Sequence, residues 1–193
     1  MALGKHNRAF TTRASRFGFG LIELMIVIAI VAILTVIALP SYQLAMQRNR
    51  VVTDTNDFVA ALNLARNEAV ARGRPVTVCA SANGTSCDGS GVSDWSGGYI
   101  VFTDYDPVGA IDAGAGDTIL RVIGPVASHD VLHSTSGAAG YVNFTRLGTA
   151  KLIGAVDDEV TFQVYATPCV DNTARDISVT SFGRTASMQS ECP

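Results

Sequence analysis

The sequence predicts an α+β protein in which one long N-terminal helix packs against an antiparallel β-rich head. Three observations lead to this fold class: an apolar run over Leu24–Leu39, a helical stripe that continues to residue 73, and alternating strand patterns beyond it. The 193 residues are enough to bury one core of ordinary size. We expect a short leader, a membrane half and an amphipathic half of the helix, and a globular head, covering residues 1–18, 19–43, 44–73 and 74–193.

The charge pattern separates the first 18 residues from the rest of the chain. Charged residues make up 16% of the sequence and hydrophobic residues 48%, which excludes a disordered polyelectrolyte. The formal net charge is −3, and because residues 1–18 hold four bases and no acid, the other 175 residues carry −7. An acidic body disfavours general affinity for nucleic acid, since phosphate binding depends on Lys and Arg.

The apolar run is long enough to enter a membrane. It is interrupted only by Thr35, and together with Leu21 and Ile22 it approaches the roughly 20 residues that span a bilayer. A secretory signal would have a shorter apolar region, about 7–15 residues, followed by a small-x-small cleavage site. Because the bases precede the run and the acidic body follows it, the positive-inside rule places the leader in the cytoplasm and the body across the membrane.

Glu23 lies near the start of this apolar run, where a carboxylate needs an explanation. An ionised side chain costs roughly 2.5–3.5 kcal/mol at the centre of a membrane helix and less near its end. The side chain can extend to the lipid headgroups, or its carboxyl group can stay protonated. Alternatively, Glu23 is ionised and pairs with a cation. Cleavage between Gly18 and Phe19 would create an α-amino group one helical turn away, which could neutralise Glu23 on the same or an adjacent chain.

The segment Gly18-Phe19-Gly20-Leu21-Ile22-Glu23-Leu24 resembles the processing site of type IV prepilins and type II secretion pseudopilins. The resemblance implies cleavage after Gly18 by the prepilin peptidase and N-methylation of the new terminal Phe19. It also implies that Glu23 guides entry of the subunit into a filament. Gly20 departs from the Thr or Ser that is usual in the family. The implied architecture is the type IV pilin fold.

The helix is expected to continue beyond the membrane half as an amphipathic stalk. Positions at alternating spacings of four and three form one helical face, which predicts packing on a sheet. They are Val51, Thr55, Phe58, Leu62, Ala65 and Ala69. Gly73 and Pro75 give a stop signal for the helix. Within the membrane half, Pro40 stands where many members of the resembled family carry a proline that kinks the helix.

Beyond Gly73 the sequence predicts antiparallel β-strands. Short runs rich in β-branched and aromatic residues alternate with clusters of Gly, Asp and Ser. The expected strands are Pro75–Cys79, Tyr99–Thr103, Thr118–Ile123, Tyr141–Thr145, Val160–Tyr165 and Ile177–Phe182. They would form a head that covers the amphipathic half of the helix.

Further segments narrow the resemblance to one family. Ala61–Val70 followed by Arg72–Cys79, Trp95 with Gly97–Asp104, and Ser181–Arg184 resemble the GspH/FimT family, which includes FimU-like minor pilins. The resemblance implies a minor type IV pilin of a tip complex that primes or caps pilus assembly, with twitching motility and adhesion downstream. An alternative is a minor pseudopilin of a type II secretion system that supports protein export.

The same resemblance implies partners and a location. The partners would be other minor and major pilins or pseudopilins, the prepilin peptidase and the inner membrane. The chain would cross the bacterial inner membrane once, with a periplasmic head. It would then enter a pilus or pseudopilus at or beyond the cell surface.

The four cysteines point to an oxidising compartment, because they form neither a CxxC pair nor a Cys/His cluster at zinc spacing. Four cysteines allow three pairings. We favour Cys79 with Cys87 and Cys169 with Cys192, since each pair closes a local loop and the second pins the C-terminus to the head. The alternative is that one pair stays reduced and merely packs.

The sequence predicts no metal site, no cofactor and no catalytic centre. The segment Asp104–Asp112 begins like a calcium loop, but Val108 occupies a ligand position and Ala115 stands where a bidentate Glu should close the shell. His129 and His133 have the spacing of a zinc pair on a helix, yet the residues between them are typical of a strand. No nucleophile elbow, P-loop or dinucleotide fingerprint is present, so an enzyme is not expected.

A DNA-uptake function is the third hypothesis. Some relatives that resemble this chain capture DNA through a basic C-terminal segment with two arginines around a Gly-Arg motif. Here Arg184 keeps the first arginine, while Ala186 stands where the second would be. Arg175 and Arg184 could still form a local patch, but residues 51–193 hold 16 acids against eight bases, which opposes DNA binding. The alternative is that Arg184 ends a strand and pairs with an acid.

Overall fold

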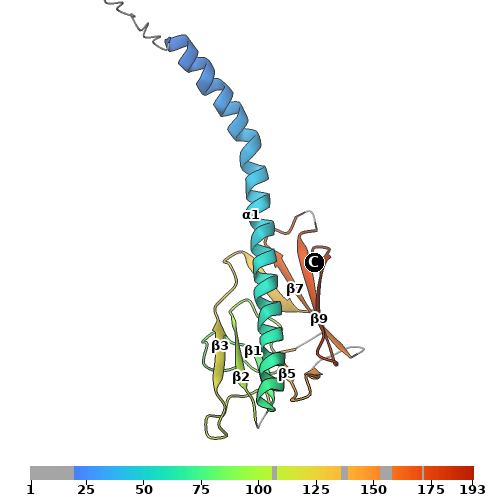
Figure 1. The fold of residues 1–193 in the computed structure, drawn as a ribbon. Coiled ribbons are helices and arrows are strands. Elements are labelled where there is room, and N and C mark those ends of the chain that lie inside the picture. Colours follow the sequence, from blue (N-terminus) through green and yellow to red (C-terminus); the bar gives the residue numbers. More distant parts are fainter. Residues whose placement is uncertain (1–19, 106–107, 136–138, 153–157, 171) are drawn as a thin grey trace, which may run out of the picture. The chain divides into compact units, whose positions relative to one another are not determined.

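The computed structural model describes residues 20–105, 108–135, 139–152, 158–170 and 172–193 (Figure 1). Within these ranges the chain has one α-helix and nine β-strands. It divides into two compact units, Met1–Gln43 and Leu44–Pro193, and the second unit contains every strand. We call the second unit the head.

The helix α1 (Leu21–Arg72) begins after Gly20, whose carbonyl accepts the amides of Glu23 and Leu24 at 3.1 and 3.2 Å. Its most apolar 18-residue window has a mean hydropathy of 3.0, so this part is long and apolar enough to cross a membrane by length and composition. Pro40 lies inside α1, and the helix continues through it. The kink expected there stays a prediction.

In the head, α1 packs its apolar stripe into the core. Every position of the predicted stripe is buried: Val51, Thr55, Phe58, Leu62, Ala65 and Ala69. The helix ends at the expected glycine, because Gly73 adopts a φ of +64°. Its amide donates to the carbonyl of Val70, and the amide of Arg74 donates to that of Ala69, which satisfies two of the last four carbonyls of the helix.

The strands form two antiparallel sheets rather than one. The five-stranded sheet has the order β3-β2-β1-β5-β6, and the four-stranded sheet has the order β4-β7-β8-β9. The first contains β1 (Val76–Ala80), β2 (Tyr99–Thr103), β3 (Ile119–Ile123), β5 (Tyr141–Phe144) and β6 (Ala150–Leu152). The second contains β4 (Asp130–Ser134), β7 (Glu159–Ala166), β8 (Ala174–Thr180) and β9 (Thr185–Ser190).

The predicted α+β class is confirmed, with a long N-terminal helix on antiparallel sheets. All six expected strands are present, with ends displaced by up to three residues. Three strands were not in the expected set, namely β4, β6 and β9. Strand β6 has only three residues, and β9 pairs with β8 alone, at the edge of its sheet.

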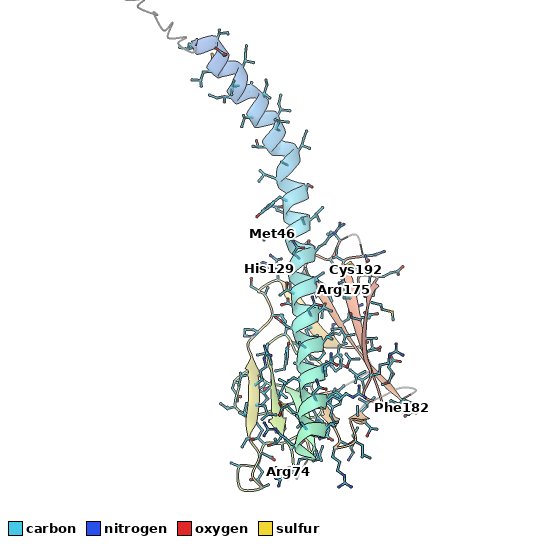
Figure 2. The ribbon with its side chains drawn as sticks, in the orientation of Figure 1. Met46, Arg74, His129, Arg175, Phe182 and Cys192 are labelled. Atoms are coloured by element: carbon cyan, nitrogen blue, oxygen red, sulfur yellow. A yellow bond between two sulfur atoms is a disulfide. The ribbon has the colours of Figure 1, made fainter. Side chains whose placement is uncertain are left out.

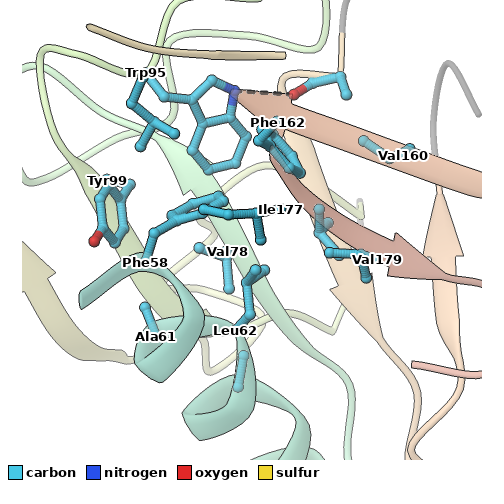
Figure 3. Packing of buried hydrophobic residues seen from close by; sticks show 14 of the residues in the cluster. Phe58, Ala61, Leu62, Val78, Trp95, Tyr99, Val160, Phe162, Ile177 and Val179 are labelled. Atoms are coloured by element: carbon cyan, nitrogen blue, oxygen red, sulfur yellow. Dashed lines mark hydrogen bonds between the residues drawn. The ribbon is translucent and has the colours of Figure 1, made fainter. Parts of the chain in front are cut away.

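An aromatic cluster joins the helix to both sheets. The ring of Phe58 from α1 lies 5.4 Å from Trp95, 5.1 Å from Tyr99 of β2 and 4.9 Å from Phe162 of β7, all in edge-to-face contact (Figure 3). The Trp95 indole N–H donates to the carbonyl of Ala139 at 3.1 Å. Because each pair is buried and well oriented, this cluster fixes the helix against both sheets.

Candidate assembly and binding sites

The predicted processing site lies at the N-terminal end of α1. Gly18 and Phe19 lie outside the described residues. Glu23 is in the first turn of α1, where the partial positive charge of a helix N-terminus favours a carboxylate. Its neighbours Ile22 and Leu24 are exposed apolar side chains, so this segment needs lipid or other helices around it. The role of Glu23 in assembly stays a prediction.

Two disulfides close loops of the head. The structure pairs Cys79 with Cys87 and Cys169 with Cys192, the pairs that local spacing favours. The Cα atoms are 5.6 and 5.8 Å apart, within the usual range for a disulfide. The first bond ties the loop after β1 back to the sheet, and the second ties the C-terminal segment to the loop before β8.

The two candidate DNA-binding arginines do not come together. Arg175 lies near the start of β8, opposite Gln189 of β9, and lines a cavity of about 190 Å³ together with Arg48. Arg184 lies in the turn at the other end of this hairpin, about 17 Å along the strand at roughly 3.3 Å per residue. The two side chains therefore form no common patch. Arg184 is exposed, and no ion pair found among the described residues includes it.

The acidic loop that resembles a calcium site is organised around a buried carboxylate. Asp104 is fully buried, and its Oδ2 accepts bonds from Thr77 Oγ1 at 2.5 Å, the Gly109 amide at 2.8 Å and Asn143 Nδ2 at 3.4 Å. Burial raises the pKa of Asp104 above its ordinary value. These bonds hold the loop on β1 and β5, which is a structural role.

No group of three or more His, Cys, Asp or Glu side chains in the described part of the chain is arranged to hold a metal ion. Asp106, one of the carboxylates of the loop, lies outside it. The two histidines also have different surroundings. His129 Nδ1 lies 3.1 Å from Ser128 Oγ in a turn, and His133 of β4 packs edge-on against the ring of Tyr165.

A pair of carboxylates between α1 and β4 was not anticipated from the sequence. Asp54 lies beside Asp130, whose side chain is fully buried, and Arg50 Nε is 3.4 Å from Asp130 Oδ2. Burial first, and then the neighbouring Asp130 and Asp57, together raise the pKa of Asp54 to about 6. Burial and the nearby acids thus favour the protonated form of Asp54 over its carboxylate.

This pair predicts that the head is more stable at pH 5 than at pH 7.5. A carboxyl whose pKa rises on folding holds its proton more tightly in the folded chain, so stability is lost as pH rises from the ordinary value of 3.8 through about 6. Asp54→Asn should weaken this dependence, although the buried Asp104 keeps part of it, and should stabilise the head at pH 7.5 by on the order of 1 kcal/mol after allowance for solvent screening.

Urea unfolding at the two pH values measures this effect. Glu68→Gln is the matched control, because Glu68 forms a partly exposed pair with Arg72 on the same helix. The control should keep the pH dependence of the native chain. An Asp54→Asn chain with an unchanged pH dependence would show that Asp54 is not the titrating group.

The comparison with known proteins decides the family. The family model described as type II transport protein GspH matches residues 54–183, which is two thirds of the chain. The chain belongs to the GspH family. The model of the prokaryotic N-terminal methylation motif matches residues 13–39 of this GspH-family chain, across the predicted cleavage pair and Glu23.

Relatives of this GspH-family chain include filament proteins. Two fimbrial proteins of Pseudomonas aeruginosa are each 41% identical to it over 71 residues, which is 37% of this chain and 46% of theirs. The match therefore spans less than half the length of these relatives. The crystal structure of the type IV minor pilin FimU of Pseudomonas aeruginosa is 24% identical, with a TM-score of 0.54, and the match covers 75% of this chain and 96% of that one. This likeness shows the shared pilin fold.

Proposed function

We propose that this chain is a minor type IV pilin, a structural subunit that primes or caps pilus assembly. The observation that carries the proposal is that a single helix joins the N-terminal methylation motif to the start of the GspH match. The methylation motif covers residues 13–39, the GspH match begins at residue 54, and α1 runs without a break from Leu21 to Arg72. The role is one of assembly with other pilins and uses no catalytic chemistry.

The proposed maturation begins with cleavage between Gly18 and Phe19 by the prepilin peptidase, followed by N-methylation of Phe19. The new amino group then lies one helical turn from Glu23 and neutralises it within the apolar environment. Before assembly the apolar half of α1 anchors the chain in the inner membrane, with the head in the periplasm, where the two disulfides form. The subunit then leaves the membrane as part of a filament.

A second candidate function is that of a minor pseudopilin in type II secretion, because the matching family is itself described as a type II transport protein. The two functions share the anchor, the processing site and the head. They differ in the filament that contains the chain, a pilus or a pseudopilus, and in what that filament supports, twitching or protein export.

Deletion of the chain in its native cell separates the two. A minor pilin predicts loss or strong reduction of surface pili and twitching, with protein export unchanged and pili restored by the full-length chain. A defect confined to protein export would replace the pilin function with the pseudopilin function. Normal pili together with normal export would contradict both.

A further inference from the structure

Two turns of the head have the same construction. In turn 145–149, between β5 and β6, the fourth residue, Gly148, donates its amide to the carbonyl of the first residue at 2.9 Å. The first residue donates its own amide to the carbonyl of the fifth at 2.8 Å. In turn 180–184, between β8 and β9, Gly183 is the fourth residue and the equivalent distances are 2.8 and 3.0 Å. The φ angles of the two glycines are +77° and +73°.

Arg66 of α1 joins the two turns, although they belong to different sheets. Its Nε donates to the carbonyl of Gly148 at 2.9 Å, and its Nη2 donates to that of Phe182 at 3.4 Å. The backbones of the turns also touch, because a Cβ at Gly183 would lie 2.1 Å from the oxygen of Gly148. Arg66 and the contact between the two backbones therefore hold both turns in fixed positions on α1.

The third residue of each turn is a large apolar side chain directed to solvent. Leu147 is 79% exposed and Phe182 is 77% exposed, whereas turns are ordinarily built from Gly, Pro, Asn, Asp and Ser. Val70, in the last turn of α1, is 54% exposed and lies beside Gly148. Large apolar side chains that are exposed together and held on a supported backbone mark an interaction site.

Two exposed arginines, Arg146 and Arg184, stand next to these apolar side chains in the same turns. We call Val70, Arg146, Leu147, Phe182 and Arg184 the turn surface. Neither turn contains an acid, although residues 51–193 hold 16 acids against eight bases. The turn surface is thus a basic and apolar area on an acidic head, bordered by the acidic start of β7. Its complement is an acidic surface with an apolar recess.

The location of the turn surface also bears on its partner. Figure 2 shows Phe182 at the end of the head where Arg74 follows α1, away from Met46 and Cys192. If two turn surfaces paired with each other, the arginines of one copy would face the arginines of the other, and like charges repel. A head-to-tail contact between copies of this chain would repeat without closing, which suits a bulk subunit and not a minor one.

We propose that the turn surface docks onto an acidic head surface of a different subunit of the same filament. The inference rests on the proposed function as a filament subunit. Leu147 and Phe182 fill the apolar recess of that neighbour, and Arg146 with Arg184 pairs with its acids. Arg66 takes no part in the contact itself, since it is a positioning residue that holds both turns in place.

Photo-cross-linking of the full-length chain in its native cell tests the contact. Benzoylphenylalanine replaces Phe182 in one variant and Met188 in the control, because Met188 is a 60% exposed apolar residue of β9 outside the turn surface. The Phe182 variant should give an adduct with another filament subunit, and the control should not. Equal adducts from both positions, or adducts of Phe182 only with a second copy of this chain or with nucleic acid, would overturn the proposal.

Charge and apolar variants give a second readout. Two double variants should each lower the amount of the chain in sheared filaments by about tenfold or more. The apolar variant combines Phe182→Ser with Leu147→Ser, and the charge variant combines Arg146→Glu with Arg184→Glu. The amount of disulfide-bonded chain in the membrane should stay at the native level, which shows that the head folds. If the native chain is found in filaments and both variants remain there equally, the turn surface is not the contact. If the native chain is absent from filaments, the proposed function itself fails.

Discussion

Replacing Glu23 with alanine is expected to remove the chain from filaments while its head stays folded. The carboxylate lies in the first turn of α1 among exposed apolar side chains, far in sequence from the core of the head. In the proposed mature chain, the amino group of Phe19 would then lack a counter-charge in an apolar environment, which would weaken lateral packing of the helices. We expect the chain in sheared filaments to fall by at least about tenfold, which corresponds to roughly 1.4 kcal/mol.

The matched control is Glu68→Ala, which removes another acid from the same helix. Glu68 forms a partly exposed pair with Arg72, a kind of contact that contributes little. This variant should enter filaments as the native chain does. Native incorporation of the Glu23→Ala chain, or equal loss of both variants, would contradict the role given to Glu23.

Replacing Phe58 with alanine is expected to give the largest loss of stability. Phe58 is fully buried and contacts Trp95, Tyr99 and Phe162, so its removal leaves a cavity where α1 meets both sheets. Truncation of a buried aromatic residue typically costs about 3–5 kcal/mol, which is a large part of the roughly 5–15 kcal/mol that holds a domain folded.

Urea unfolding of the full-length chain in detergent measures this loss. Trp95 is the single tryptophan and lies 5.4 Å from the ring of Phe58, so its fluorescence reports on this part of the core. Phe182→Ala is the control, because it removes the same side chain from an exposed position and should change stability by less than about 0.5 kcal/mol. A loss below about 1 kcal/mol for Phe58→Ala would show that the cluster does not hold the helix on the two sheets.

The helix could be predicted well because its signals are local. The spacing of Val51, Phe58, Leu62 and the other stripe residues depends only on the 3.6-residue period, and all of them are buried as expected. The C-terminal end was equally clear, since Gly73 adopts the left-handed conformation that ends many helices. Both disulfide pairs agree with the favoured pairing, in which each cysteine joins its neighbour along the chain, 8 and 23 residues away.

The strands outside the expected set lack the usual sequence signal. Strand β9 reads Thr-Ala-Ser-Met-Gln-Ser and has no buried residue, so its pairing with β8 and not its own composition makes it a strand. Strand β6 is too short to show a period. The division into two sheets was also not foreseen, because it depends on β1 pairing with β5, which is about 60 residues away in sequence.

The unexpected parts of the candidate sites are contacts between distant segments. Asp54 and Asp130 come together from α1 and β4, and each residue alone is typical of a solvated surface. Arg66 lies off the apolar stripe, yet it joins two turns that follow it by more than 80 residues. Periodicity assigns a side chain to a helix face but does not show which loops reach that face.

The claim that this chain is a processed filament subunit is tested most directly by its intact mass. The chain is isolated from the membranes and from the sheared filaments of its native cell, without an added tag, and the two disulfides are left intact. We predict a chain that begins at Phe19 and has the mass of residues 19–193 with both disulfides formed plus one CH2 unit, the net gain of a single N-methylation. A chain that keeps residues 1–18, or one that begins beyond the apolar run at Leu39, would contradict the account.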